Sequence, residues 1–204
     1  MATIPGVLFH EHGGDPQIPN GDWIAFSYGG HDALFGGTGN DEILAFGGHD
    51  TVVGGVGNDM IAAFGGHDLL IGGVGNDTII GFGGHDTLIG GVGDQLLDGN
   101  GSSDLIVAGQ GNDTIIGGGS HDTFVFGSGG GRDVVMDFHQ GDILQIQQNI
   151  NGLNVSTAAD LASHISSDGH GNAVLDLGNG DSVTLIGIKP ETLSHDLNSY
   201  VKIH

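Results

Sequence analysis

Aspartate recurs every nine residues through the middle of the chain. Ten aspartates share this phase: Asp32, Asp41, Asp50, Asp59, Asp68, Asp77, Asp86, Asp104, Asp113 and Asp122. Each comes after a turn rich in glycine and two positions before a large apolar residue, as in GGVGNDTII at residues 72–80. Carboxylate and backbone carbonyl oxygens are the ligands that calcium prefers, at about 2.3–2.6 Å. The spacing therefore predicts repeated cation binding.

The chain has almost no positive charge of its own to offset these acids. Its 204 residues include 25 Asp and Glu but only 3 Lys and Arg, for a formal net charge of −22. This field is unfavourable for binding nucleic acid or an anionic membrane, so neither is expected as a partner. Cysteine is absent, which excludes disulfides and thiolate sites. Positive charge from outside the chain would relieve the self-repulsion.

A nine-residue period with 43 glycines does not suit a helix. It suits a turn of about six residues followed by a strand of three, so two repeats make one coil of 18 residues. Stacked coils lie about 4.8 Å apart, and the apolar residue of each triplet points inward to form a core one side chain thick. No run approaches the roughly 18 apolar residues of a membrane-spanning helix.

Stacking places alternate aspartates in two columns on opposite edges of the coil. The column through Asp50, Asp68 and Asp86 is unbroken, whereas Gln95 interrupts the column through Asp77 and Asp113. Carboxylates about 5 Å apart repel strongly, and a dication between successive coils removes the conflict. Glycine carbonyls would complete the ligand set, and the candidates are Gly48, Gly57, Gly66, Gly75 and Gly84. The alternative, that Asp and Gly are only turn residues, would suit one repeat better than ten in phase.

The repeats GGTGNDEIL, GGVGNDMIA and GGVGNDTII match the pattern G-G-x-G-x-D-x-U-x in full. Over about residues 27–125 the chain therefore resembles the RTX, or hemolysin-type, calcium-binding repeat family. The resemblance implies an all-β fold, a right-handed parallel β-roll of stacked nonapeptide repeats with a small C-terminal β/α cap. It further implies several bound Ca2+ ions, one per pair of stacked turns, and export through a type I secretion channel.

The resemblance also divides the chain. Residues 1–26 are expected to form an N-terminal arm or cap, residues 27–128 the calcium-binding β-roll, and residues 129–204 a capping region with the secretion signal. GGGRDVVMDFHQGDILQI (129–146) and NAVLDLGNGDSVTLIGI (172–188) are similar to the segment that closes the roll of serralysin-type proteases and its following hairpin. Asp133 falls two residues out of phase with the repeats. The N-terminus lacks the features of a cleaved signal peptide.

Two further columns accompany the aspartates. His31, His49, His67, His85 and His121 precede acids of one column, and they either bind a transition metal or haem or merely stack at a turn position. Tyr28, Phe46, Phe64 and Phe82 also recur every 18 residues, as a stacked ladder or as a binding strip. The HEH at residues 10–12 is not the H-E-x-x-H of a zinc protease and is assigned to the N-terminal arm.

The last position of each triplet should point outward but is apolar, as at Val53, Ile71 and Ile80. Such faces predict either self-association or covering by the C-terminal region. The expected function is a secreted, extracellular or cell-surface protein that folds on binding Ca2+ and has a structural, adhesive or self-assembling role. It is not expected to be an enzyme. The alternatives are a substrate-binding or targeting module of an extracellular enzyme, and metal or haem binding by the histidines.

Overall fold

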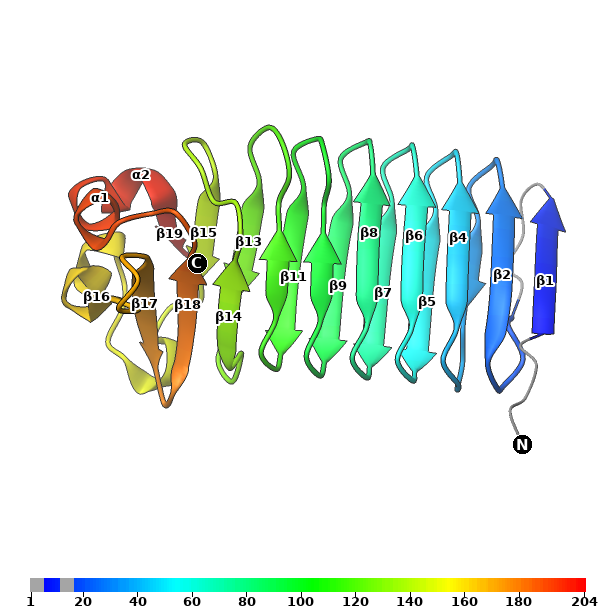
Figure 1. Ribbon diagram of the computed structural model, residues 1–204, viewed down its shortest axis with the longest axis horizontal. Helices are drawn as coiled ribbons and strands as arrows, with labels where there is room; N and C mark the ends of the chain where they lie inside the picture. The colour runs from blue at the N-terminus through cyan, green and yellow to red at the C-terminus, as the bar shows by residue number, and fades with distance from the viewer. Residues whose placement is uncertain (1–5, 12–16) are drawn as a thin grey trace.

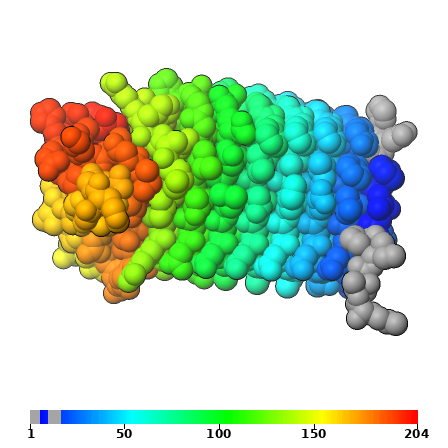
Figure 2. Space-filling model, viewed as in Figure 1, coloured from blue at the N-terminus to red at the C-terminus, as the bar shows by residue number. Residues whose placement is uncertain are grey.

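The computed structural model describes residues 6–11 and 17–204 and shows an elongated parallel β-roll (Figure 1). The chain runs up through the near sheet, crosses over, returns through the far sheet and advances from right to left, which makes the coil right-handed (Figure 1). Figure 2 shows the successive coils as neighbouring bands along the long axis. The predicted fold class is confirmed. Two parts of the predicted N-terminal arm, residues 1–5 and 12–16, lie outside the described residues. The second of them includes the last histidine of HEH.

Two sheets form the walls of the roll, and their strands alternate along the chain. The first sheet has 11 strands, in the order β1 (Gly6–Glu11), β2 (Trp23–Tyr28), β4 (Glu42–Phe46), β6 (Met60–Phe64), β8 (Thr78–Phe82), β10 (Leu96–Asp98), β12 (Thr114–Ile116), β14 (Arg132–Val135), β18 (Asp181–Leu185), β17 (Ala173–Gly178) and β16 (Ile165–Ser167). The second has 8 strands, in the order β19 (Val201–Ile203), β15 (Ile143–Ile146), β13 (Thr123–Phe126), β11 (Leu105–Gln110), β9 (Thr87–Val92), β7 (Leu69–Val74), β5 (Thr51–Val56) and β3 (Ala33–Phe35).

The strands pair in parallel with the predicted 18-residue register. Ile43 lies opposite Ile61 in one sheet, and Val52 lies opposite Leu70 in the other. The expectation of three-residue strands is wrong in the central coils, where β5 and β7 have six residues each. The extra length arises because the glycines that follow each triplet stay in the ladder, as Gly55 does opposite Gly73. The turns are correspondingly shorter.

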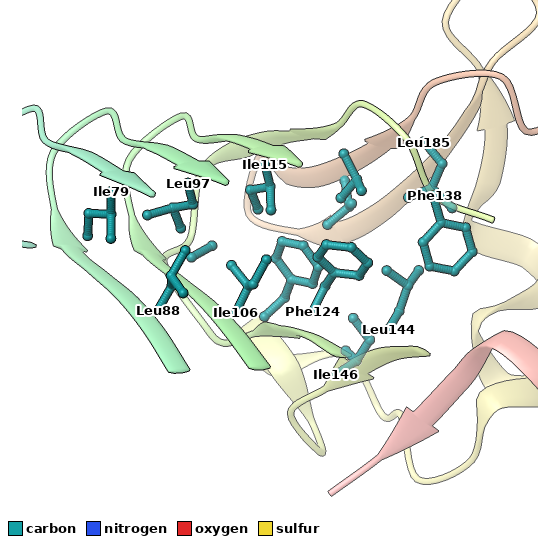
Figure 3. Packing of buried hydrophobic residues seen from close by; sticks show 14 of the residues in the cluster. Ile79, Leu88, Leu97, Ile106, Ile115, Phe124, Phe138, Leu144, Ile146 and Leu185 are labelled. Carbon is teal, nitrogen blue, oxygen red and sulfur yellow. The ribbon is translucent and has the colours of Figure 1, made fainter. Parts of the chain in front are cut away.

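The core is a file of inward-pointing side chains from both sheets. Ile79, Leu88, Leu97 and Ile106 are fully buried and stack one coil upon the next (Figure 3). Their neighbours along each strand are only half-buried, as the alternating burial of β5 and β7 shows. The core widens toward the C-terminal end, where the ring of Phe124 lies 5.9 Å from that of Phe138. A core this narrow gives each coil little burial of its own, so each depends on its neighbours.

The C-terminal region stacks on the end of the roll. β14 and β15 lie beyond residue 128 and still pair in parallel with β12 and β13, while β17 and β18 form an antiparallel hairpin. Short helices complete the cap, and they are η1 (Ile150–Gly152), η2 (Ala158–His164), α1 (Pro190–His195) and α2 (Leu197–Tyr200). The region thus extends the sheets, and the alternative that it covers an outer face is wrong (Figure 1). The division at residues 26 and 128 stays a prediction.

The outer faces carry the predicted apolar ladders. The rings of Tyr28, Phe46, Phe64 and Phe82 stack in sequence, with centroids 4.6–5.2 Å apart. Val53, Ile71 and Ile80 are half-buried by their neighbours in the ladder. None of the helices in the described part of the chain is both long enough and apolar enough to cross a membrane.

Candidate metal centre

One hydrogen bond repeats along both aspartate columns. From Asp41 onward, the Oδ1 atom of each in-phase aspartate accepts the backbone N–H of the residue 18 positions earlier, on the preceding coil. Asp68 accepts from Asp50 at 2.7 Å, Asp86 accepts from Asp68 at 2.8 Å, and Asp77 in the other column accepts from Asp59 at 2.8 Å. Every carboxylate therefore reaches back across the gap between two coils, and its position is set by the backbone of the neighbouring turn.

The second carboxylate oxygen is buried and lacks a hydrogen-bond donor. Within the described residues this holds for Oδ2 of nine aspartates, which are Asp41, Asp50, Asp59, Asp68, Asp77, Asp86, Asp104, Asp113 and Asp122. These residues are at most 4% exposed. An ionised oxygen in a dry site without a donor is unfavourable by several kcal/mol, so such groups are normally paired or bound to metal.

Glycines make room for these oxygens. A methyl group at Gly72 would collide with Oδ2 of Asp77 and would lie 2.6 Å from the carbonyl oxygen of Gly90. Gly54 has the same relation to Oδ2 of Asp59, with the carbonyl oxygen of Gly72 at 2.7 Å. A carboxylate and a carbonyl oxygen thus approach the same side-chain-free position. Two oxygens that converge in this way repel unless a cation lies between them, and both are calcium ligands.

Burial shifts the acids toward their neutral form. Loss of solvent, with a smaller contribution from nearby aspartates, raises the pKa of Asp68 and Asp77 to about 6 and that of Asp104 to about 7. Asp41, Asp113 and Asp122 also have a pKa raised to about 6, chiefly by burial. The charged columns are therefore unfavourable without a counter-charge, which a bound dication would supply.

Gln95 shows what the turn requires when the acid is absent. Its Oε1 accepts the N–H of Asp77 at 2.7 Å, the same bond that the aspartates make. Its Nε2 donates to the carbonyl oxygen of Gly75 at 2.9 Å. An amide N–H thus satisfies the carbonyl that a cation would satisfy in an aspartate turn. Gly75 is one of the predicted carbonyl ligands, and its oxygen does face the column.

The predicted glycines of the other column stack in the same manner. Gly66 has φ of +109°, and a Cβ atom added there would collide with the carbonyl oxygen of Gly48. The same Cβ atom would lie 3.2 Å from Oδ1 of Asp68. Gly84 repeats this contact with Gly66, and Gly57 faces Gly39 in the opposite column. The turn carbonyls therefore point along the axis toward the next coil. Their role as ligands stays a prediction.

Protein groups terminate the first column at both ends. Ser27 donates its hydroxyl to Asp32 at the N-terminal end. At the other end His139 donates to Oδ2 of Asp142 through its backbone N–H at 2.8 Å, and its Nδ1 lies 2.6 Å from the same oxygen. Asp142 raises the pKa of His139 through this bond. Protein donors thus satisfy Oδ2 of Asp142 where the stack of coils ends.

Sequence reasoning missed two members of the columns. Oδ1 of Asp133 accepts the N–H of Asp113, and Oδ1 of Asp142 accepts the N–H of Asp122, both at 3.0 Å and both across 20 residues. Asp133 is therefore in the column, because the chain loops out two extra residues before it. The signal was present in the sequence, since each acid stands two positions before a buried apolar residue, as in Asp142 and Leu144.

The histidine column forms a stack of exposed rings. Ring centroids of His31, His49, His67 and His85 lie 5.0–5.1 Å apart, and the first three planes are inclined by 15–19°. Imidazole lone pairs lie in the ring plane, so neighbouring rings in a stack do not aim them at one ion. Among the described residues no three His, Asp or Glu side chains cluster closely enough to hold a metal. This geometry favours the stacking interpretation, and calcium sites here would rely on backbone carbonyls.

Comparison with known proteins identifies the family to which the chain belongs. The structure of the extracellular lipase LipA from Serratia marcescens is similar, with a TM-score of 0.45 and 20% identity, over 95% of this chain and 40% of the lipase chain. No curated protein matches the chain. The family described as RTX calcium-binding nonapeptide repeat (4 copies) matches residues 26–61, 63–94 and 98–135, more than half of the sequence. The chain belongs to this family of calcium-binding repeat proteins.

Proposed function

We propose that this calcium-binding β-roll protein is secreted and folds when it binds Ca2+ outside the cell. The proposed ligands are the ten in-phase aspartates and the turn carbonyls of Gly48, Gly57, Gly66, Gly75 and Gly84. Several ions would lie along the two edges of the roll, each between successive coils. The roll serves as a scaffold, and we assign no catalytic residue to it.

The observation that carries the proposal is the row of nine buried Oδ2 atoms without a donor in the described structure. The chain has a net charge of −22 and a core one side chain thick, so collapse without cations is opposed by repulsion and weakly driven by burial. A cation that bridges two coils removes repulsion and joins segments 18 residues apart. Its binding free energy is then available for folding, as at other structural metal sites.

The proposal includes export of the chain from the cell. The resemblance of residues 129–204 to the C-terminal region of type I secreted proteins supports passage of an unfolded chain through a type I channel. Folding that waits for calcium would keep the chain unfolded until it leaves the cell. The fold itself is compatible with this order, because its carboxylates are unfavourable as buried charges until a cation arrives.

The biological role we propose is structural or adhesive, through the outer face of the first sheet. Phe9 and Val7 at its N-terminal end are 66% and 52% exposed, and Met60, at the start of the strand that ends in Phe64, is 43% exposed. Apolar area arranged in rows on a flat face is typical of a contact surface. Light scattering in calcium should detect self-association, and changing Met60 and Phe64 to Ser should reduce it; a monodisperse monomer at all concentrations would exclude it.

Circular dichroism tests the main proposal. The chain in chelator should give a coil spectrum and should change to a β spectrum at millimolar calcium, while magnesium at equal ionic strength should be much less effective because it requires smaller octahedral sites. Native mass spectrometry should then count several calcium ions per chain. A β-rich spectrum that is insensitive to chelator, or a folded chain that carries no calcium, would contradict the proposal.

A further inference from the structure

The two sheets of the roll differ in the charges that their strands carry. The repeat strands of the second sheet, β3, β5, β7, β9, β11 and β13, contain no acidic, basic or histidine side chain. The first sheet, in contrast, carries Glu42 in β4, Asp98 in β10 and Arg132 in β14. In a chain with a net charge of −22, one wall of the roll is therefore built from uncharged strands.

The outer surface of these six strands, which we call the aliphatic face, carries rows of apolar side chains. Val53 and Ile71 lie opposite each other in the parallel ladder and are half-buried. A second row stands at the ends of β5, β7 and β9 and consists of Val56, Val74 and Val92, which are 52%, 50% and 47% exposed. The rows repeat from coil to coil, so the apolar area is contiguous.

The described part of the chain leaves the aliphatic face open. The C-terminal region continues the second sheet through β15 and β19 beyond β13, and it does not fold over the outer surface of the strands before them. The face belongs to the far wall of the roll in Figure 1, on the side opposite to the outer face of the first sheet. Contiguous exposed apolar area of this kind usually marks a contact surface.

The charge of the chain indicates which partner fits the face. Anionic lipids and nucleic acid are repelled by a net charge of −22. A basic partner would find no acid in these strands to pair with. An identical face buries no charge when it makes contact, so neither copy loses the hydration of an ionised group. The aliphatic face is therefore best matched by the same face of a second copy.

The size of the face is sufficient for a specific pair. A strand of six residues is about 20 Å long, and six strands about 4.8 Å apart cover about 29 Å. Because β3 and β13 are shorter, the face covers roughly 500 Å² on each copy, or roughly 1,000 Å² for a pair, where specific interfaces begin. Gly55 and Gly73 lie between the two rows along their strands, and without side chains they allow a partner surface to approach closely.

We propose that a second copy of this chain packs on the aliphatic face and forms a two-fold symmetric dimer, with the two sheets about 10 Å apart. The inference rests on the proposed function and deepens its self-association, because it assigns a pairing role to the second sheet. The first-sheet faces of both copies then point away from each other. The dimer thus presents the proposed adhesive surface twice, which strengthens attachment to a repetitive target.

Formation of this dimer requires calcium for two reasons. The aliphatic rows exist only when the coils are stacked in register, and stacking is the proposed consequence of calcium binding. The aspartate columns follow the two edges of the roll, so cations bound there also reduce the repulsion between two approaching copies. The chain should therefore be a monomer in chelator and a dimer in calcium.

Sedimentation velocity of the full chain in calcium tests the proposal. The data should fit a monomer–dimer equilibrium that saturates at two copies. Sodium chloride at constant calcium should strengthen the dimer, because salt screens the repulsion between the copies and the interface contains no ion pair to weaken. A dimer that dissociates as salt is added would overturn the uncharged interface.

Val74→Lys is the decisive variant, because Val74 lies near the middle of the face. Two ammonium groups would enter the interface without a partner, so the dissociation constant of the dimer should rise by about tenfold or more. The added lysine lowers the net negative charge, so weaker pairing cannot result from stronger general repulsion. Leu96→Lys is the matched control, since Leu96 is 38% exposed on the first sheet. Equal dissociation constants for the two variants would refute the proposal.

A conservative variant guards against a loss of folding. Changing Val56, Val74 and Val92 together to threonine keeps the side-chain shape and the preference for a strand but adds a hydroxyl to each. Circular dichroism should give the calcium midpoint of the wild type, while the dissociation constant of the dimer should rise several-fold. A folded threonine variant that dimerises like the wild type would show that the aliphatic face is not the interface.

The outcomes separate this inference from the proposed function. A wild-type chain that neither binds calcium nor folds with it fails the proposed function itself. A chain that folds with calcium but stays a monomer at every concentration overturns the dimer, and so does binding to neutral phosphatidylcholine vesicles that Val74→Lys abolishes, because the occupant is then a lipid surface. Association that Met60→Ser with Phe64→Ser removes, and Val74→Lys does not, would place the contact on the first sheet and would also overturn the inference.

Discussion

The turn at Gln95 and the turn at Asp68 make the same hydrogen bond to the preceding coil, but they differ in whether they need a cation. Both side chains accept the N–H of the residue 18 positions earlier, at 2.7 Å in each case. They differ in the second terminal atom: Oδ2 of Asp68 has no donor in the described structure, whereas Nε2 of Gln95 donates to the carbonyl of Gly75. One turn is complete without a cation, and the other is not.

This difference separates two properties of the repeat. The backbone shape of the turn depends on one hydrogen bond, which either side chain can make. The need for a cation depends only on whether the second atom is a donor or an acceptor. The end of the first column supports the same conclusion, because His139 supplies the donor for Asp142 where no further coil follows. The repeat can therefore lose a cation site without losing its fold.

The largest expected effect comes from removing an aspartate that has aspartates on both sides. Asp68→Ala removes a charged hydrogen bond, worth about 1.5–3 kcal/mol, and a carboxylate between Asp50 and Asp86. The calcium midpoint of folding should rise by on the order of tenfold or more. Asp113→Ala should have a smaller effect, because its neighbour Gln95 makes no use of a cation. Calcium titrations followed by circular dichroism compare the two, and equal midpoints would refute this ranking.

Acid should partly replace calcium. The pKa of Asp41, Asp68, Asp77, Asp113 and Asp122 is raised to about 6 in the roll, above the ordinary value of 3.8. A raised folded-state pKa means that the folded chain binds more protons, so its stability increases as pH falls through the folded-state value toward the unfolded one.

Circular dichroism in chelator should therefore show β-structure appearing between about pH 7 and pH 4, without metal. Calcium affinity should fall over the same range, because protons compete for the same oxygens. A metal-free chain that loses structure on acidification would show that repulsion between buried carboxylates does not control folding.

Restoring the acid at Gln95 should create a cation site. Gln95→Asp places an acceptor opposite the carbonyl of Gly75, so native mass spectrometry should count one more calcium ion and the calcium-free chain should become less stable. Gln110→Asp is the matched control, because it adds the same charge at an exposed position. An unchanged ion count in Gln95→Asp, with the chain folded, would mean that the second atom does not decide occupancy.

The smallest effect is expected in the exposed ladders. His67→Asn replaces a stacked ring with the residue that occupies the corresponding turn of the other column, where Asn76 donates its N–H to Oδ1 of Asn58 at 2.8 Å. Exposed substitutions of this kind change stability by about 0.5 kcal/mol or less. The calcium midpoint should stay within about twofold of the wild type. A large shift, or zinc binding lost in this variant, would favour the metal-binding interpretation of the histidines.

Much of this protein follows from its sequence alone. The nine-residue phase predicted the 18-residue register, the inward position of residues such as Ile79 and the two columns of acids, because every coil repeats the same local preferences. Periodicity is sufficient here, since each coil contacts only its neighbours. The same reasoning underestimated the length of the strands, because glycines that are typical of turns stay in the parallel ladder, as Gly55 and Gly73 do.

Tertiary structure determined the conformation of the segments in which the nine-residue spacing is interrupted. Counting placed Asp133 out of phase, yet a loop absorbs two residues and returns its carboxylate to the column. The position of the C-terminal region at the end of the roll, and the meeting of Asp133 with Asp181 across about 50 residues, depend on contacts that no local pattern encodes. The conformation of each repeat is set by contacts with its nearest neighbours. The end of the repeat array depends instead on packing between residues that are far apart in the sequence, which only the folded chain brings together.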